Sequence, residues 1–185
     1  MDKFHTILDA AYAHFGAKGF YDTKISEIAE TAGIAKGTVY LYFKSKEQLF
    51  AAVSKRDFDT FLEHLEEGLA AKQSLEDQLR FIAKHHLEYY YDRKDHTKLF
   101  FMAPNNDPEL MKMMEHFLQS YMNRVFSVMK EGGIKEPMLH AKSYIGMLDR
   151  LKMDILFNHE FTRENLEKDI HFVSHLFIHG CAIPE

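Results

Sequence analysis

The chain has 185 residues, of which 46% are hydrophobic, and its formal net charge is −5. This is enough apolar material for one or two domains with a buried core, and no apolar stretch approaches the roughly 18 residues of a membrane-spanning helix. The single cysteine, Cys181, excludes an intramolecular disulfide and a cysteine-based zinc framework. Because no secretory leader pattern opens the chain, we expect a soluble cytoplasmic protein that does not enter a membrane.

Apolar residues recur at helical spacing along the chain, and no run alternates apolar and polar residues for long enough to predict a strand. We therefore expect an all-α fold of about nine helices. Four of them are predicted in the first third: from about Lys3 to Lys18, from a Thr23 cap to about Ala32, from Lys36 to Phe43, and from a Ser45–Gln48 capping box to about Leu69.

The remaining two thirds of the chain contain five further helical patterns. They run from about Ser74 to Tyr91, from Thr97 to Met102, from Pro108 to Gly132, from Pro137 to Asn158, and from a Thr162 cap to Gly180.

The second and third predicted helices have the spacing of a helix-turn-helix unit. Gly33 stands at the tight turn, where a positive φ is needed. Ala29 is small where the two helices cross, and Ile28, Ile34 and Val39 would form the buried wedge between them. Ordinary packing of two helices could also produce this spacing, so the surface residues decide between the two interpretations.

With Val39 and Phe43 pointing inward, the third helix leaves tyrosines, a lysine and a threonine on its outer side. Such groups suit the major groove of DNA, because phenols and hydroxyls bind phosphates or base edges and a glycine permits close approach. The alternative is a solvated face with incidental tyrosines. The candidate DNA-binding residues are Thr23, Lys24, Lys36, Gly37, Thr38, Tyr40, Tyr42, Lys44 and Lys46.

The stretch "TKISEIAETAGIAKGTVYLYFKSKEQLF" resembles the N-terminal signature of the TetR/AcrR family of one-component transcriptional regulators, and the likeness covers about residues 4–50. It departs from the family pattern at Ala35, where many members have a Ser or Thr that caps the third helix, and at Lys24, where a Thr or Ser is common. The resemblance implies homodimers that place one helix-turn-helix unit in each of two major grooves, while an effector alters the spacing of the units.

From the resemblance we expect a three-helix helix-turn-helix DNA-binding domain at residues 1–47. The long fourth helix would join it to a helical effector-binding and dimerisation domain at residues 48–185. The acidic net charge does not contradict DNA binding, because residues 1–50 carry equal numbers of basic and acidic side chains and the excess lies beyond them. Four lysines then form a local positive patch on an acidic body.

The C-terminal two thirds contain nine of the ten methionines and two apolar helical stripes. Stripes at this spacing are more often core than ligand site, yet their Met and aromatic content suits an adaptable apolar cavity for a small effector. The candidate ligand-binding residues are His86, Tyr89, Phe117, Tyr121, Met147 and Arg150.

Polar residues interrupt the last two predicted helices. Arg150 and Asp154 stand four apart and can pair as an exposed ridge, an interface ion pair or a polar anchor in the cavity. Three histidines, His171, His175 and His179, face away from the core stripe of the last helix; an interface role, a metal site and a pH-responsive interface are the alternatives.

By family resemblance the last two helices build the dimer, and the candidate interface residues are Leu148, Ile155, His171 and His175. We expect no metal and no cofactor.

Enzyme motifs are lacking, since there is no Gly-rich phosphate loop, no Gly-x-Ser-x-Gly elbow and no catalytic frame around Cys181. The sequence therefore predicts a repressor, not an enzyme, that binds a palindromic operator as a homodimer and responds to an apolar effector. The alternatives are an adaptor that acts chiefly through a protein partner and a transcriptional activator.

Overall fold

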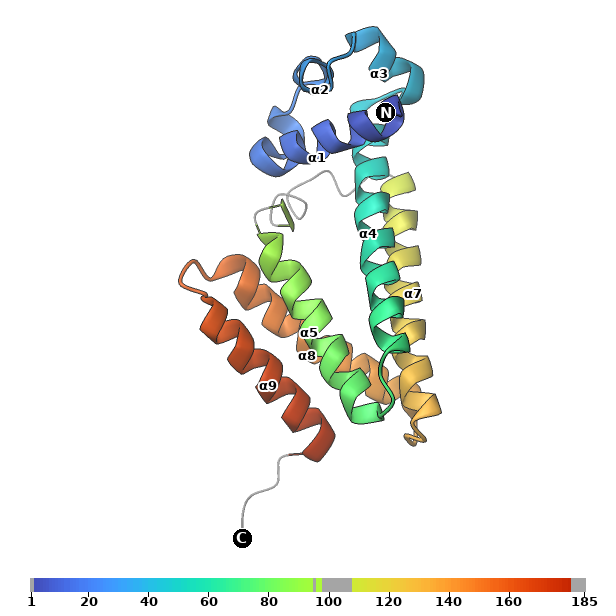
Figure 1. The fold of residues 1–185 in the computed structure, drawn as a ribbon, viewed down its shortest axis with the longest axis vertical. Helices are drawn as coiled ribbons and strands as arrows, with labels where there is room; N and C mark the ends of the chain where they lie inside the picture. The colour runs from blue at the N-terminus through green and yellow to red at the C-terminus, as the bar shows by residue number, and fades with distance from the viewer. Residues whose placement is uncertain (1, 95, 98–107, 181–185) are drawn as a thin grey trace. The chain divides into compact units, whose positions relative to one another are not determined.

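The computed structural model describes residues 2–94, 96–97 and 108–180, and the ordered elements within these ranges are helices without a β-strand. The all-α prediction is therefore confirmed. The helices are α1 (Lys3–Asp22), α2 (Ile25–Thr31), α3 (Lys36–Tyr42), α4 (Lys46–Ala70), α5 (Leu75–Asp92), α7 (Pro108–Glu131), α8 (Pro137–Phe157) and α9 (Arg163–His179) (Figure 1). The helix predicted at Thr97–Met102 lies, beyond Thr97, outside the described residues.

The chain divides into two compact units. Unit 1 comprises Met1–Thr60 and Asp95–Phe117, and unit 2 comprises Phe61–Lys94 and Leu118–Glu185. Helices α4 and α7 each contribute residues to both units. The functional boundary expected after residue 47 is a different kind of division and stays a prediction.

Helix α1 begins at the predicted residue and continues past its predicted end. Asp2 caps it, because its Oδ1 accepts the Phe4 N–H at 3.1 Å. Gly19 has the left-handed φ predicted for it, 78°, but it kinks the helix and does not end it, so the predicted end at Lys18 is too early. One further turn follows this bend before the helix ends at Asp22.

The prediction that Thr23 caps α2 is wrong. Thr23 is buried, and its hydroxyl donates to the carbonyl oxygens of Gly19 at 2.7 Å and His14 at 3.1 Å. It therefore closes the end of α1. Helix α2 begins one residue later, where the Lys24 N–H donates to Glu27 Oε2 at 3.3 Å.

Helices α2 and α3 form the predicted helix-turn-helix unit. Gly33 has a φ of 66°, and the Ile34 N–H that follows it donates to the Ala29 carbonyl at 3.0 Å. Ile28 and Val39 are fully buried between the helices. The left-handed conformation of Gly33 and the buried apolar side chains of both helices therefore define the turn.

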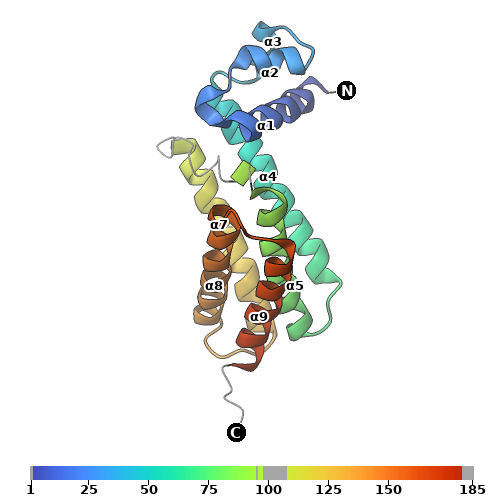
Figure 2. The same cartoon turned by 90° about the vertical axis from the view of Figure 1, so that its left-hand side faces the viewer.

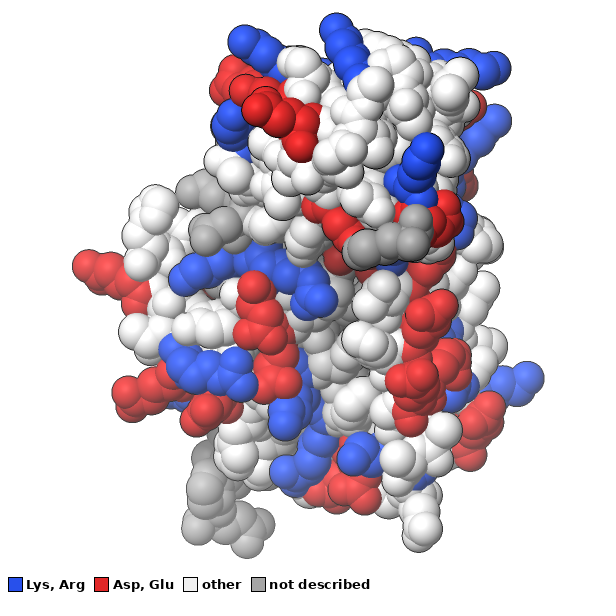
Figure 3. Space-filling view, turned by 45° about the horizontal axis from the view of Figure 1, so that its top comes forward, with Lys and Arg blue, Asp and Glu red and all other residues white. Residues whose placement is uncertain are grey.

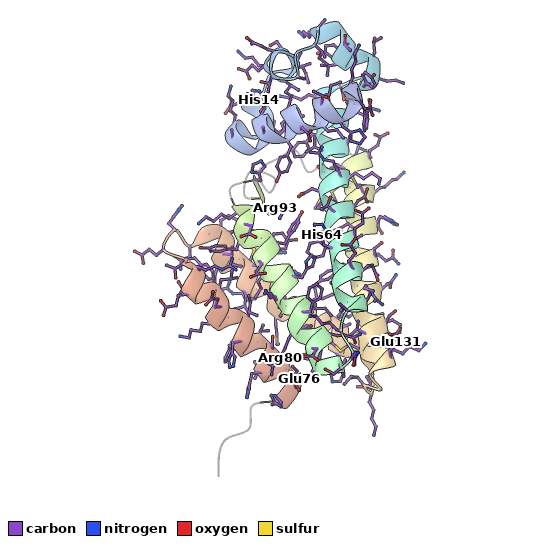
Figure 4. The ribbon with its side chains drawn as sticks, in the orientation of Figure 1. His14, His64, Glu76, Arg80, Arg93 and Glu131 are labelled. Carbon is purple, nitrogen blue, oxygen red and sulfur yellow. The ribbon has the colours of Figure 1, made fainter. Side chains whose placement is uncertain are left out.

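Side-chain bonds attach α2 to α1. His14, labelled on α1 in Figure 4, lies with its Nε2 2.8 Å from Thr31 Oγ1, and Lys18 Nζ donates to Glu27 Oε1 at 3.0 Å. Below them, apolar side chains of α1 to α4 form one core in unit 1. The helix-turn-helix unit thus rests on a shared hydrophobic base.

The caps predicted for three longer helices are present. The Gln48 N–H donates to Ser45 Oγ at 3.0 Å, and the Asp77 N–H donates to Ser74 Oγ at 3.1 Å. Thr162 and Asn165 make both bonds of a capping box at the start of α9. These local bonds define where α4, α5 and α9 begin.

In unit 2, helices α5, α8 and α9 pack on one another, as both views in Figures 1 and 2 show. Tyr144 of α8 is fully buried, and its hydroxyl donates to the Leu79 carbonyl of α5 at 2.7 Å. The apolar stripes predicted on α5 and α7 also lie inside, since Ile82, Tyr121 and Val125 are buried.

Candidate nucleic-acid interface and effector region

Helix α3 is anchored on one side and open on the other. Val39 and the following Phe43 are buried, whereas Tyr40 and Tyr42 are 45% and 42% exposed. A β-carbon added at Gly37 would meet no heavy atom within 4 Å. The outer side of α3 therefore offers two phenols beside a position where another molecule can approach the backbone closely.

Leu41 is the residue of α3 that the sequence reasoning missed. At 100° per residue it points almost directly away from Val39 and Phe43, and it is 84% exposed. A leucine is usually assigned to the core, so composition gave no reason to single it out. The helical angle measured from the two buried residues would have identified it.

Contacts on unit 1 position the two tyrosines. The Lys36 ammonium lies 5.9 Å from the ring centroid of Tyr40, and the ring of Tyr42 lies 6.2 Å from that of Phe4 on α1. Each phenol is thus held by a neighbour while its outer edge stays open. This limits the rotamer freedom that binding would otherwise remove.

The flanking candidates differ in availability. Lys24 and Lys44 are exposed. Lys46, in contrast, donates through Nζ to the carbonyl oxygens of Tyr21 at 3.2 Å and Thr23 at 3.1 Å, and it lies 4.5 Å from the Phe20 ring. Lys46 therefore closes the end of α1, and Thr23, which is buried, offers no side chain to DNA.

We expect Lys44→Ala to affect DNA binding and Lys46→Ala to affect the stability of the fold. Loss of a phosphate contact lowers the slope of log K against log salt by about 0.9 per contact. Lys44→Ala should flatten the slope and leave the melting temperature unchanged. Lys46→Ala should lower the melting temperature, because two carbonyls lose their donor, and should leave the slope unchanged. Salt titrations and thermal melts check both, and the reverse pattern would contradict the assignment.

Basic side chains stand around the upper edge of unit 1 in Figure 3; uncharged atoms lie between most of them, and a group of acidic side chains stands at the upper left. The lysines of the candidate surface come from the α1–α2 junction, from α3 and from the residues just before α4. These lysines flank the uncharged outer side of α3, which suits a phosphate backbone on either side of a groove.

Three ligand-binding candidates, His86 and Tyr89 of α5 and Tyr121 of α7, come together in unit 2. His86 Nδ1 lies 3.1 Å from the Tyr121 hydroxyl, and Phe61 of α4 packs edge-on against Tyr89 and Tyr121 at 4.9 and 5.3 Å. Arg93, labelled at the end of α5 in Figure 4, lies 4.4 Å from the Tyr89 ring. Phe61 was not among the predicted residues, because α4 was considered a connecting helix.

The other ligand-binding candidates have different contacts. Phe117 belongs to unit 1 and stacks on Phe58 at 4.3 Å. Met147 is half-buried, and Arg150 points to solvent, where its Nη1 donates to Asp154 at 2.8 Å. The predicted pair is therefore present as a surface ridge. Arg150 does not join the His86 cluster, and of its three predicted roles the structure has the exposed ridge.

Two dimer-interface candidates are wrong as well. Leu148 and Ile155 are 0% and 2% exposed within their own chain, so they cannot present side chains to a partner. His171 and His175 are exposed, with ring centroids 6.1 Å apart, and remain candidates.

Helices α8 and α9 instead carry large apolar side chains that are exposed, and we call these together the α8–α9 face. Its large apolar members are Leu139, Met153, Phe157 and Phe172. Asp169 of α9 lies near Asp154 of α8: burial raises the pKa of Asp169, and the Asp154 carboxylate raises it further. The interface prediction failed because the sequence does not indicate which apolar residues of α8 face inward.

Two further surveys concern the described part of the chain. No three His, Cys, Asp or Glu side chains there are grouped so that they could hold a metal ion. None of its helices is long and apolar enough to span a bilayer. A groove of about 560 Å³ between α5 and α9 is lined largely by charged groups, including Arg80, Lys84, Glu88 and Glu167.

Known proteins share this sequence pattern. Residues 7–53 match the sequence model of the family described as "Bacterial regulatory proteins, tetR family". The chain is 30% identical to the fatty acid metabolism regulator protein of Bacillus subtilis (strain 168). The alignment covers 135 residues, which are 70% of this chain and 68% of that protein. The chain is 34% identical over 103 residues to the HTH-type transcriptional regulator RutR of Escherichia coli (strain K12), spanning 54% and 47% of the two chains.

Solved structures share the fold. The FadR transcriptional regulator of Bacillus subtilis, in complex with stearoyl-CoA, superposes with a TM-score of 0.78 at 23% identity, over 97% of this chain and 100% of that chain. A TetR/AcrR-family regulator from Thermobifida fusca gives a TM-score of 0.80 at 22% identity, over 99% and 100%. With the helix-turn-helix unit and the relatives above, these findings lead to one conclusion: the chain belongs to the TetR family of bacterial regulatory proteins.

Proposed function

We propose that this DNA-binding transcription regulator is a repressor that binds an inverted-repeat operator as a homodimer and is released by an acyl-CoA. The observation that carries the DNA-binding part is the outer side of α3, where Tyr40, Leu41 and Tyr42 project away from a firmly buried anchor. Blocking polymerase access is the simplest consequence of occupying an operator. Such a protein acts in the cytoplasm, where its DNA lies.

The proposed division of labour on DNA follows from exposure and chemistry. Gly37, Thr38, Tyr40 and Leu41 would face base edges in the major groove. The residues assigned to backbone phosphates are Lys24, Lys36, Tyr42 and Lys44. Thr23 and Lys46 are left out, because their polar atoms are occupied inside unit 1.

The homodimer would form through the α8–α9 face. Large exposed apolar side chains on two adjacent helices are typical of a protein interface, and a two-fold axis pairs such a face with itself. His171 and His175 would lie at or near its edge. The two recognition helices would then bind half-sites about one helical turn apart, roughly 34–36 Å.

The effector class is proposed from two supports. One relative is named for fatty acid metabolism, and one structural neighbour was solved with stearoyl-CoA. In this chain, the cluster of Phe61, His86, Tyr89 and Tyr121 combines aromatic rings with a few polar groups, the composition that ligand sites have. A long acyl chain suits such aromatic rings.

The experiment is footprinting of the purified full chain on the DNA beside its own gene, with and without stearoyl-CoA. Protection of an inverted repeat that disappears with stearoyl-CoA supports the whole proposal. Protection that strengthens with stearoyl-CoA would replace release by activation of binding. Diffuse protection that disappears at higher salt would contradict binding to a specific operator and would favour a role through a protein partner.

Leu41→Ala is expected to alter base preference at one position in each half-site. An apolar side chain at the outermost point of α3 suits a thymine methyl group, and a good base contact gives about 1–3 kcal/mol of discrimination. Replacing that thymine by uracil should weaken wild-type binding and leave Leu41→Ala unaffected. Isotherms on the two operators measure this, with Leu118→Ala, another exposed leucine, as the control. Equal sensitivity of wild type and Leu41→Ala to the missing methyl would remove Leu41 from the groove.

A further inference from the structure

A row of polar groups runs from the surface of unit 2 into its interior. Asp149 of α8, with a side chain 45% exposed, pairs with Lys152, whose side chain is 13% exposed. The Lys152 ammonium lies 4.8 Å from the Tyr90 ring. At the inner end, His86 is only 2% exposed and its Nε2 lies 3.7 Å from Asp149 Oδ1. The row therefore connects a solvated carboxylate with a buried imidazole.

The inner end of this row is not satisfied. Among the described residues, Nε2 of His86 has no hydrogen-bond partner, and 3.7 Å to Asp149 is beyond hydrogen-bond range. A buried polar group left without a partner is costly, so each such group in a native protein needs an explanation. A bound molecule that supplies the missing partner is such an explanation.

The charge and tautomer of the His86 ring determine which kind of group can bond to Nε2. Burial lowers the pKa of His86 well below its ordinary value, and the nearby Lys152 charge lowers it further, so the ring is neutral. A neutral ring has one N–H and one bare nitrogen. Tyr121, whose pKa burial raises, keeps its proton and can donate to Nδ1. The Asp149 carboxylate beyond Nε2 favours the proton there, so Nε2 is a donor that needs an acceptor.

We propose that His86 is the polar anchor of the effector site and that its Nε2–H binds the thioester carbonyl oxygen of an acyl-CoA. This assignment rests on the proposed function: it names the residue that binds the effector and the group of the effector that the residue binds. A neutral acceptor is preferred to a fatty acid carboxylate, because the Lys152 ammonium beside His86 is already paired with Asp149. Tyr121 is a positioning residue, since it sets which ring nitrogen carries the proton.

The test compares two ligands that differ in one oxygen. Stearoyl-CoA has the thioester carbonyl, and S-octadecyl-CoA, a thioether, does not. We expect wild type to bind stearoyl-CoA roughly tenfold more tightly by calorimetry, which corresponds to about 1.4 kcal/mol. In His86→Phe, which keeps an aromatic ring without a donor, the two ligands should bind equally, at the thioether level. The control His159→Phe, at an exposed histidine between α8 and α9, should keep the tenfold preference.

The outcomes separate the two proposals. If wild type binds neither CoA ligand, the acyl-CoA effector is wrong and the anchor is wrong with it. If wild type binds both equally, or if His86→Phe keeps the preference, the effector class stands and the His86 anchor is overturned. The wild-type comparison alone remains decisive if His86→Phe fails to fold, and stearate binding as tightly as stearoyl-CoA would also contradict a neutral acceptor.

Discussion

Replacing Gly37 by leucine is expected to abolish operator binding while the chain remains folded. Gly37 lies in α3 with open space where a β-carbon would be, so the fold accepts a side chain there. The same open space is the proposed contact with the floor of the major groove. A leucine would hold the backbone away from the bases, and each half-site would lose contacts that are worth about 1–3 kcal/mol.

Alanine at the two glycines of the helix-turn-helix unit provides the matched comparison. Gly37→Ala should raise the free energy of unfolding by up to about 1 kcal/mol, because alanine is the better helix former. Gly33→Ala should lower it by about 1 kcal/mol, because its φ of 66° strains any side chain. Denaturant unfolding measures the stabilities, and operator isotherms measure the binding. Wild-type affinity in Gly37→Leu would exclude Gly37 from the interface.

The double substitution Phe157→Glu with Phe172→Glu is expected to give a folded monomer that no longer binds the operator. Both rings are largely exposed within one chain, at 47% and 58%, so their loss does not open the core. In a two-fold dimer each chain would bring two added carboxylates into one desolvated face. Burying unpaired charges is strongly unfavourable, and the half-sites need both recognition helices joined.

Sedimentation velocity and operator isotherms check this expectation. Leu118→Glu is the control, because Leu118 has almost the same exposure, 56%, but lies on α7, outside the α8–α9 face. The control should remain dimeric and bind normally. A dimeric Phe157→Glu/Phe172→Glu variant would show that the subunits associate through another surface.

Local chemistry made the helix-turn-helix unit predictable. Gly33, the small Ala29 and the spacing from Ile28 to Val39 act within about a dozen neighbouring residues, and the structure has them in the predicted arrangement. The caps at Ser74 and Thr162 are equally local, since each bonds a residue three positions away. Patterns whose partners are close in sequence are those that sequence alone can establish.

The candidate sites were harder to predict, because they depend on which surface a side chain meets. Thr23 and Lys46 are polar residues beside a DNA-binding unit, yet both satisfy carbonyls near the end of α1. Leu41 is apolar, yet it stands outermost on α3. Residue type predicts a preference for water or core, and the position of the neighbouring helix decides the outcome.

The sequence by itself determined an all-helical chain, a helix-turn-helix unit with Gly33 at its turn, and a methionine-rich and aromatic C-terminal region. Only the tertiary structure decided that Leu148 and Ile155 turn inward while Phe157 and Phe172 remain exposed, and that His86 meets Tyr121 and Asp149. Helical periodicity specifies which residues share a stripe. Which stripe is buried depends on the packing of α5, α8 and α9, because contacts between distant segments set the rotation of each helix.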